Sequence, residues 1–208
     1  MEKNLKAHWE TVYTTKTPQE VSWTQEKPSI SLDFISSFPL GKSASIIDIG
    51  GGDSLLVDHL LDLGYTNISV LDISAYAIER AKHRLGERAS LVHWIVSDIN
   101  EFQPEKTYDL WHDRAAFHFL TAPSDIRQYA SLVANHANNL VIGTFSTDGP
   151  LKCSGLEITQ YDEASLGNLF EAEGFDHIEN KREDHQTPFG TTQNFVFASF
   201  RATNTSKK

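Results

Sequence analysis

The stretch that decides the fold is Ile46-Ile-Asp-Ile-Gly-Gly-Gly-Asp-Ser54. It opens with a short β-branched strand over 45–49 and ends in three consecutive glycines. Leucines then recur at helical spacing from Leu55 to Leu63, and Gly64 is a natural helix stop. A glycine turn between strand and helix lets the backbone approach a ligand closely and directs the free N–H groups of the helix toward it. The segment therefore predicts a βα unit with a ligand at the turn.

The glycine pattern argues against a nicotinamide dinucleotide as that ligand. Such sites usually carry GxGxxG, in which the third glycine eases packing between helix and strand. Here Gly50-Gly51-Gly52 is followed by Asp53, Ser54 and Leu55, so the third glycine is missing. Asp53 would also repel a pyrophosphate at the helix start, and we expect a ligand that carries an amino group and a positive charge.

Two further carboxylates follow the next predicted strands. Asp72 follows a strand over 67–71, where it can accept hydrogen bonds from both ribose hydroxyls, and Asp98 follows a strand over 91–96, where it can meet an adenine amino group. The carboxyl ends of adjacent parallel strands meet at the edge where open α/β sheets bind ligands. Together these residues predict a nucleoside pocket, whereas the glycine turn alone would also fit a tight connection without a ligand.

Farther out, short apolar runs alternate with amphipathic stretches, which is typical of βα units around a mostly parallel sheet. More strands are predicted over 108–112, 140–145, 177–181 and 194–200, and helices over 55–63, 75–85, 124–136 and 162–173. Ser74 can cap the helix over 75–85, and Gly86 closes it. We expect a single domain over 1–208, with a cover segment over 1–40 that holds a helix over 29–37, a core over 41–200 and a flexible tail over 203–208.

Composition excludes several classes of protein. The 208 residues include 18 Lys and Arg against 28 Asp and Glu, and this net charge of −10 argues against a broad nucleic-acid surface but leaves a basic protein partner open. Cys153 is the only cysteine, so neither an intrachain disulfide nor a CxxC metal site is expected. No apolar run suits a signal peptide or a membrane span, which predicts a cytoplasmic protein.

Four motifs, in this order and spacing, resemble the class I S-adenosylmethionine-dependent methyltransferases: IIDIGGGDS (46–54), VLDIS (70–74), VSDI (96–99) and YDLWHDRA (108–115). The resemblance covers residues 41–200. The segments DLWHDRAAFHFL (109–120) and GPLKCSGLEITQYD (149–162) resemble a subgroup of small bacterial methyltransferases whose acceptors are largely unassigned. The family implies a Rossmann-like α/β fold, with a seven-stranded, mostly parallel sheet in the order 3-2-1-4-5-7-6, an antiparallel last strand and helices on both faces.

The resemblance also implies the cofactor S-adenosyl-L-methionine, with S-adenosyl-L-homocysteine as product. The glycine turn, Gly50, Gly51 and Gly52, is implied to hold the methionine part, with Asp48 positioning its amino group. Asp72 is implied to bind the ribose next to Ile73, and Asp98 with Ile99 to frame the adenine. Two departures stand out. No Asn-Pro-Pro-Tyr-type motif follows the strand over 108–112, which disfavours DNA-adenine and glutamine methylation, and the usual helix before that strand is shortened to 100–106.

The residues after the fourth strand are the first candidates for the acceptor side. His112 could remove a proton from the acceptor, because imidazole titrates near neutral pH, or it could only hydrogen-bond the cofactor or the backbone. Asp113 and Arg114 could form an ion pair that organises the loop, with a catalytic role for Asp113 and a substrate-binding role for Arg114 as the alternative. Phe117 and His118 begin a turn over the pocket, where His118 could line the acceptor site or be purely structural.

Aromatic side chains of the cover segment could enclose the cofactor or simply pack on the sheet. We expect Trp9 to pack on the sheet. For Tyr13 and Trp23 both roles stay open: Tyr13 could contact the cofactor and Trp23 the acceptor, or both could only pack. Cys153 is a candidate contact of the acceptor, although a lone cysteine is usually a small buried apolar residue, and His185 is a weaker candidate. The scattered histidines show no HExxH spacing, so no metal site is expected.

The sequence thus favours methyl transfer to an N, O or S nucleophile of a small molecule. A protein-lysine methyltransferase is the alternative within the class, since an acidic surface would attract a basic partner. A non-catalytic nucleotide-binding module is the alternative from another class. The sequence assigns neither the acceptor nor the oligomeric state.

Overall fold

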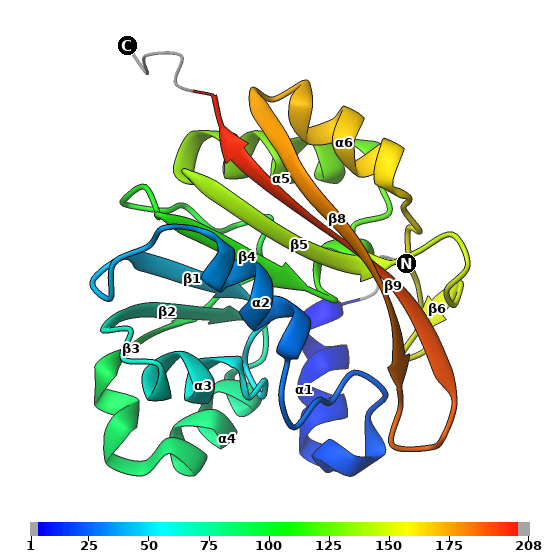
Figure 1. Cartoon of the computed structure of the whole chain (residues 1–208). Helices are drawn as coiled ribbons and strands as arrows, with labels where there is room; N and C mark the ends of the chain where they lie inside the picture. Colours follow the sequence, from blue (N-terminus) through cyan, green and yellow to red (C-terminus); the bar gives the residue numbers. More distant parts are fainter. Residues whose placement is uncertain (1–3, 204–208) are drawn as a thin grey trace.

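A twisted seven-stranded sheet runs through the computed structural model, which describes residues 4–203 (Figure 1). The strands follow the order β3-β2-β1-β4-β5-β9-β8, and β6 and β7 form a separate small hairpin. Their bounds are β1 Ser45–Ile49, β2 Asn67–Asp72, β3 Val92–Val96, β4 Leu110–Arg114, β5 Asn139–Phe145, β6 Lys152–Cys153, β7 Leu156–Glu157, β8 Phe175–Gln186 and β9 Thr192–Ala202. Because β9 runs antiparallel to both β5 and β8 while the other pairs are parallel, the predicted order and its antiparallel last strand are confirmed.

Helices cover both faces of this sheet, as predicted. Side chains of α2 (Ser29–Ser37), α3 (Leu56–Asp62) and α4 (Ala75–Leu85) pack into the core on one face. Those of α5 (Pro123–His136) and α6 (Glu163–Glu171) pack into the core on the other face, and Figure 1 shows these two helices behind the sheet. Period-two alternation explains the split, since Ile46 of β1 joins the first core and Ile47 the second.

Several element boundaries differ from the prediction. Residues 100–106 form turns and no helix, because Pro104 interrupts the segment and Asp98 closes a tight turn by accepting from the Asn100 N–H. Strands β8 and β9 are longer than predicted and extend past the sheet as a twisted ribbon (Figure 1). The hairpin of β6 and β7 was also missed, because two-residue strands leave no periodicity to detect.

The cover segment contains a helix that the prediction lacked, α1 (Leu5–Thr15), followed by the short 3-10 turn η1 (Pro18–Glu20). Two capping contacts join α1 to α4. The Glu10 carboxylate accepts from Ser74 Oγ, Ala75 N and Tyr76 N at 3.0, 2.7 and 3.2 Å, which caps the start of α4. In return, Arg80 of α4 donates to the carbonyls of Tyr13 and Lys16 at the end of α1. These contacts fix α1 beside the carboxyl ends of the strands.

Two short 3-10 segments complete the structure, η2 (Gly86–Leu91) after α4 and η3 (Phe117–Phe119) after β4. Between residues 4 and 203, no helix is both long enough and apolar enough to cross a lipid bilayer. Thr203 still donates to the Gly174 carbonyl, and the rest of the predicted flexible tail, 204–208, lies outside the described residues.

Candidate active site

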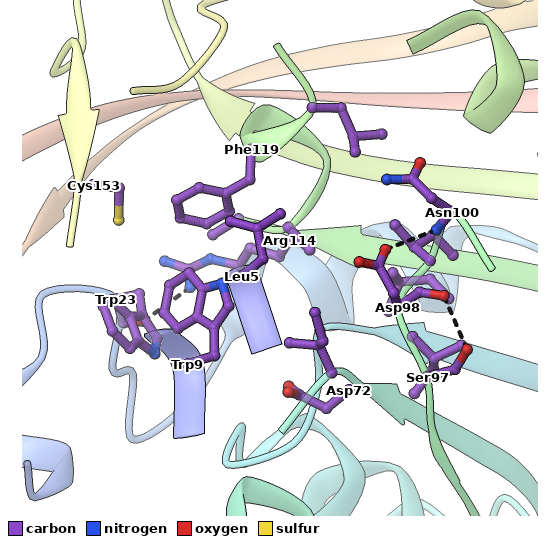
Figure 2. A pocket seen from close by; sticks show the side chains of 18 of the residues that line it. Leu5, Trp9, Trp23, Asp72, Ser97, Asp98, Asn100, Arg114, Phe119 and Cys153 are labelled. Atoms are coloured by element: carbon purple, nitrogen blue, oxygen red, sulfur yellow. Dashed lines mark hydrogen bonds between the residues drawn. The ribbon is translucent and has the colours of Figure 1, made fainter. Parts of the chain in front are cut away.

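A cavity opens at the carboxyl ends of β1 to β4, and Leu5, Trp9 and Tyr13 of α1 form part of its wall. Figure 2 shows Asp98 and Asn100 at one end of the cavity, the Arg114 guanidinium, Trp23 and Cys153 toward the other, and Asp72 between them. Besides these, the lining includes Ile49, Gly50, Leu71, Ile73, Ser97, Ile99, Ala115, Ala116, Phe119 and Leu120.

Asp72 is a buried carboxylate that the backbone holds in place. Its Oδ2 accepts from the Gly52 N–H at 3.0 Å and its Oδ1 from the Ser74 N–H at 2.8 Å. Burial is the main cause that raises its pKa to about 6, against the opposing effect of these two hydrogen bonds. Each oxygen keeps a further lone pair, so the carboxylate can still accept hydrogen bonds from a ligand in the cavity.

The glycine turn allows the backbone to approach the two neighbouring carboxylates. Gly50 has φ 67°, a left-handed conformation that L side chains rarely adopt, and a Cβ there would meet Ala116. A Cβ on Gly52 would lie 2.7 Å from the Asp72 Oδ2. Any larger residue would therefore displace the carboxylate from its backbone partners.

The far end of the cavity is formed by the residues that follow β3. Asp98 and Ile99 both line it, as does Ile73 after β2. The Asp98 Oδ1 accepts from the Asn100 N–H at 2.9 Å, which fixes the direction of the carboxylate. The structure thus brings Asp72, Ile73, Asp98 and Ile99 into one cavity.

A second hollow on the other side of the glycine turn contains a buried polar chain. Asp48 of β1 and His112 of β4 are paired positions of neighbouring strands, and His112 Nδ1 lies 2.7 Å from Asp48 Oδ1. Because a carboxylate only accepts hydrogen bonds, Nδ1 donates, and Nε2 can accept from the Ser31 hydroxyl of α2 at 2.9 Å. Both ring nitrogens are thus engaged within the protein, while the Asp48 Oδ2 is buried without a partner and lies against Gly51.

Asp53 does not act as a free negative charge at the turn, contrary to the expectation from the sequence. It forms ion pairs with Arg80 at 2.9 Å and Arg84 at 3.1 Å, and Arg84 also pairs with Asp58. The sequence could not show that two arginines of α4 face it across the turn.

Asp113 and Arg114 do not pair with each other, because successive strand residues point to opposite faces of the sheet. Asp113 accepts from the N–H groups of Ala116 and Phe117 and from the Tyr129 hydroxyl, at 3.2, 3.0 and 2.8 Å. It is fully buried, and burial raises its pKa to about 6. These contacts shape the turn after β4, and the side chain lines neither hollow.

The turn η3 places a different residue in the cavity from those expected. Phe117 packs against Tyr129, Tyr161 and Phe170 in the core, and His118 is fully buried and stacks on Phe145. Phe119 lines the cavity in place of Phe117 and His118. Burial lowers the pKa of His118 to about 3, so this ring is neutral at physiological pH.

Arg114 and the aromatic rings of the cover form the remaining end of the cavity. Trp9 contacts Trp23 and Phe119 edge-to-face at centroid distances of 5.7 and 5.0 Å, and Tyr13 is buried beside them. Cys153 is buried there too, and burial raises the pKa of its thiol to about 12, so it is not a nucleophile at neutral pH. His185 lines neither hollow and bonds the Ser22 carbonyl.

Sequence reasoning missed Ser31, Glu10 and Asn100. None belongs to a motif, and Ser31 and Glu10 reach the site only through the fold of the cover segment. Trp9 was expected only to pack, yet it lines the cavity. Among residues 4–203 there is no cluster of three or more His, Cys, Asp or Glu side chains that could hold a metal ion.

Comparisons with known proteins point in one direction. A family model described as a methyltransferase domain matches residues 47–140. Malonyl-(acyl-carrier protein) O-methyltransferase of Anoxybacillus flavithermus is 32% identical over 102 residues, which is 49% of this chain and 39% of the relative. Malonyl-(acyl-carrier protein) O-methyltransferase 2 of Ilyobacter polytropus is 29% identical over 105 residues, which is 50% of this chain and 40% of the relative. The matches therefore span about two fifths of these relatives.

A solved structure shares the fold over nearly the whole chain. The 1,6-didemethyltoxoflavin-N1-methyltransferase of Burkholderia thailandensis, with 1,6-didemethyltoxoflavin and S-adenosylhomocysteine bound, superposes with a TM-score of 0.70 over 96% of this chain and 88% of that one. At 18% identity, this likeness concerns the fold alone.

Proposed function

This chain belongs to the class I S-adenosylmethionine-dependent methyltransferases, and on that premise we propose that it transfers the cofactor's methyl group to an N, O or S atom of a small-molecule acceptor. The observation that supports this most is the placement of Asp72, Asp98 and the glycine turn around one cavity at the carboxyl ends of the strands. When bound, S-adenosylmethionine supplies an electrophilic methyl group on a sulfonium. The chain's own residues then have to hold the cofactor, align the acceptor and exclude water.

The side chains present fit this cofactor. In our proposal the Asp72 carboxylate accepts from the ribose hydroxyls with its remaining lone pairs, and Asp98 with Ile99 binds the adenine. The unpartnered Asp48 Oδ2 suits the cationic amino group of the methionine part, since a buried carboxylate oxygen without a donor is unfavourable. Tyr13 lines both the cavity and the second hollow.

His112 then acts as a positioning residue. Its ring nitrogens engage Asp48 and Ser31, so it orients Asp48 and is not available to take a proton from the acceptor. Replacement by Gln should keep one hydrogen bond and affect cofactor affinity and turnover together. Loss of turnover with unchanged cofactor affinity would instead return His112 to the role of a general base.

Aromatic rings of Trp9, Trp23 and Phe119 line the acceptor end of the cavity, which supports an acceptor with an apolar body. The relatives are named for malonyl-(acyl-carrier protein) and the solved structure for 1,6-didemethyltoxoflavin, which are O- and N-acceptors. No observation on the described residues favours the protein-lysine or the non-catalytic alternative.

Two measurements test the proposal. Isothermal titration calorimetry should show S-adenosylmethionine and S-adenosylhomocysteine binding with Kd values below about 1 mM, and NAD serves as the negative control. The methyl-labelled cofactor is then incubated with metabolite pools and, separately, with proteins from cell extract. Absence of cofactor binding would overturn the proposal, and label found in protein alone would overturn the small-molecule acceptor.

A further inference from the structure

Arg114 is a half-buried cation that forms no ion pair among the described residues. Its Nη1 donates to the Trp23 carbonyl at 2.9 Å, whereas Nε and Nη2 are buried and have no hydrogen-bond partner. Other arginines are paired with carboxylates: Arg80 and Arg84 with Asp53, Arg88 with Asp62, and Arg182 with Glu163. Among the described residues, no carboxylate lies within ion-pair distance of Arg114, although Glu183 and Asp48 are near enough to raise its pKa.

The two free nitrogens form one edge of the planar guanidinium. The N–H bonds of Nε and Nη2 are parallel, and this edge matches the two oxygens of a carboxylate. Although burial lowers the pKa of Arg114 to about 10, the group stays charged at neutral pH. A buried charge with unmet donors is costly unless a ligand supplies the missing acceptors.

The surroundings define the rest of such a ligand. The Phe195 ring lies 4.8 Å from the guanidinium carbon and covers one of its faces. Figure 2 shows the guanidinium between the rings of Phe119, Trp9 and Trp23, at the end of the cavity away from Asp98. These rings provide apolar, flat walls for a ring-containing body next to the carboxylate site.

Building on the proposed methyl transfer, we propose that the acceptor is a small organic acid whose carboxylate binds the Nε–Nη2 edge of Arg114 and whose apolar ring lies against Trp9, Trp23 and Phe119. The cofactor's own methionine carboxylate has the same chemistry and is the competing occupant of this edge. Arg114 also lines the second hollow, together with Asp48 and Gly51. The acceptor is favoured because the rings of Trp9 and Phe119 line the first cavity and not the second hollow.

Matched ligand pairs test the carboxylate directly on the natural chain. Benzoate, cinnamate, 3-phenylpropionate and indole-3-acetate, each with its primary amide, are titrated into the protein saturated with S-adenosylhomocysteine. At least one acid should bind about tenfold more tightly than its amide, since hydrogen bonds to charged groups are the strong ones. If no acid is preferred over its amide, the proposal is overturned.

Variants of Arg114 separate the two possible occupants. In Arg114→Met the preference for the acid should disappear, and in Arg114→Lys it should be reduced, while the affinity ratio of S-adenosylhomocysteine to 5′-methylthioadenosine stays within about twofold of the natural chain. If that ratio collapses in Arg114→Met, the guanidinium binds the cofactor carboxylate and the proposal is wrong. If S-adenosylhomocysteine does not bind the natural chain at all, the proposed function itself has failed, which is a separate result.

Discussion

Asp48, Asp72 and Asp113 are buried carboxylates at or near strand ends, and their partners give them different tasks. The Asp113 carboxylate accepts hydrogen bonds from two backbone N–H groups and from the Tyr129 hydroxyl, so its role is to shape the turn after β4. Asp48 keeps one oxygen free, and Asp72 keeps access to the cavity. Residue type and strand position predicted that these groups are important, but only the partners separate structural from binding roles.

The residues of the cofactor end could be anticipated because each directly follows a strand, where the parallel sheet itself fixes their position. The residues of the acceptor end could not be anticipated, because they depend on the orientation of the turn η3 after β4. Phe117, His118 and Phe119 are adjacent in sequence, yet the 3-10 turn buries the first two and directs only Phe119 into the cavity. If the turn were rotated by one residue, a different side chain would face the cavity, and no pattern in the sequence specifies this rotation.

The raised pKa of Asp72 predicts a pH-dependent affinity for the cofactor. Below about pH 6 the carboxyl is protonated and offers fewer acceptors to the ribose hydroxyls, so the affinity for S-adenosylhomocysteine should fall as pH decreases through this value. Asp72→Asn should weaken binding at pH 7 by about fivefold or more and abolish the dependence. Calorimetry from about pH 5 to about pH 8 measures both effects.

Asp98→Asn is the control for this measurement, because Asp98 lines the same cavity and should leave the step near pH 6 in place. The effect of Asp72 on stability has the opposite sign. The folded chain holds this proton more tightly than the unfolded one, so the contribution is complete below the unfolded pKa of about 3.9 and is lost as pH rises through about 6. A step in affinity that persists in Asp72→Asn would assign the titration to another group.

At the scale of elements, the β-strands with apolar runs and the capped helices followed from the sequence, whereas α1 did not. Its buried residues are only Val12 and Tyr13, and its position depends on contacts with α4 that are distant in sequence. The reciprocal caps explain why a short helix with little buried surface is ordered here. Glu10 provides N-terminal acceptors to α4, and Arg80 provides donors to the end of α1.

Glu10→Ala should therefore destabilise the protein and weaken cofactor binding at the same time. Loss of an N-terminal cap costs about 1 kcal/mol of unfolding free energy. Release of α1 also removes Trp9 and Tyr13 from the cavity wall, so the affinity for S-adenosylhomocysteine should fall by several-fold. Urea unfolding and calorimetry on the same preparation measure the two effects.

Glu79→Ala provides the matched control on α4. Its carboxylate is exposed and pairs only one turn away with Lys82, so the unfolding free energy should change by less than about 0.5 kcal/mol and cofactor affinity should not change. If Glu10→Ala lowers stability but leaves cofactor affinity intact, α1 does not enclose the cofactor.

At the scale of the whole molecule, ion pairs within the chain occupy several of the 28 acidic side chains, so these carboxylates are not free to bind a ligand or partner. Asp53, Asp58, Asp62, Glu157 and Glu163 all pair with Lys or Arg. The charges left without ion pairs around the cavity are the carboxylates of Asp72 and Asp98 and the guanidinium of Arg114. This arrangement fits a ligand pair with a neutral nucleoside at one end and an anion at the other.

His118 should make the stability of the whole fold depend on pH. Its pKa is lowered to about 3 in the folded protein, whereas the unfolded chain has the ordinary value of about 6.5. Between these values the unfolded chain binds a proton that the folded chain does not, so the contribution to stability is present above about pH 6.5 and is lost as pH falls. The buried Asp72 and Asp113 act in the opposite direction, since both pKa values are raised to about 6.

His118→Asn isolates this contribution. The Asn side-chain oxygen can replace Nδ1 as the acceptor for the Phe145 N–H, but it does not titrate. The variant is expected to lose up to about 1.4 kcal/mol per pH unit of slope in unfolding free energy between about pH 4 and pH 6, so that it gains stability relative to the natural chain as pH falls. Urea unfolding across this range measures the slope, and His93→Asn, at an exposed histidine, should leave it unchanged. Equal slopes for His118→Asn and the natural chain would mean that His118 takes up a proton in the folded state, which its burial against Phe145 and its unpartnered Nε2 make unfavourable.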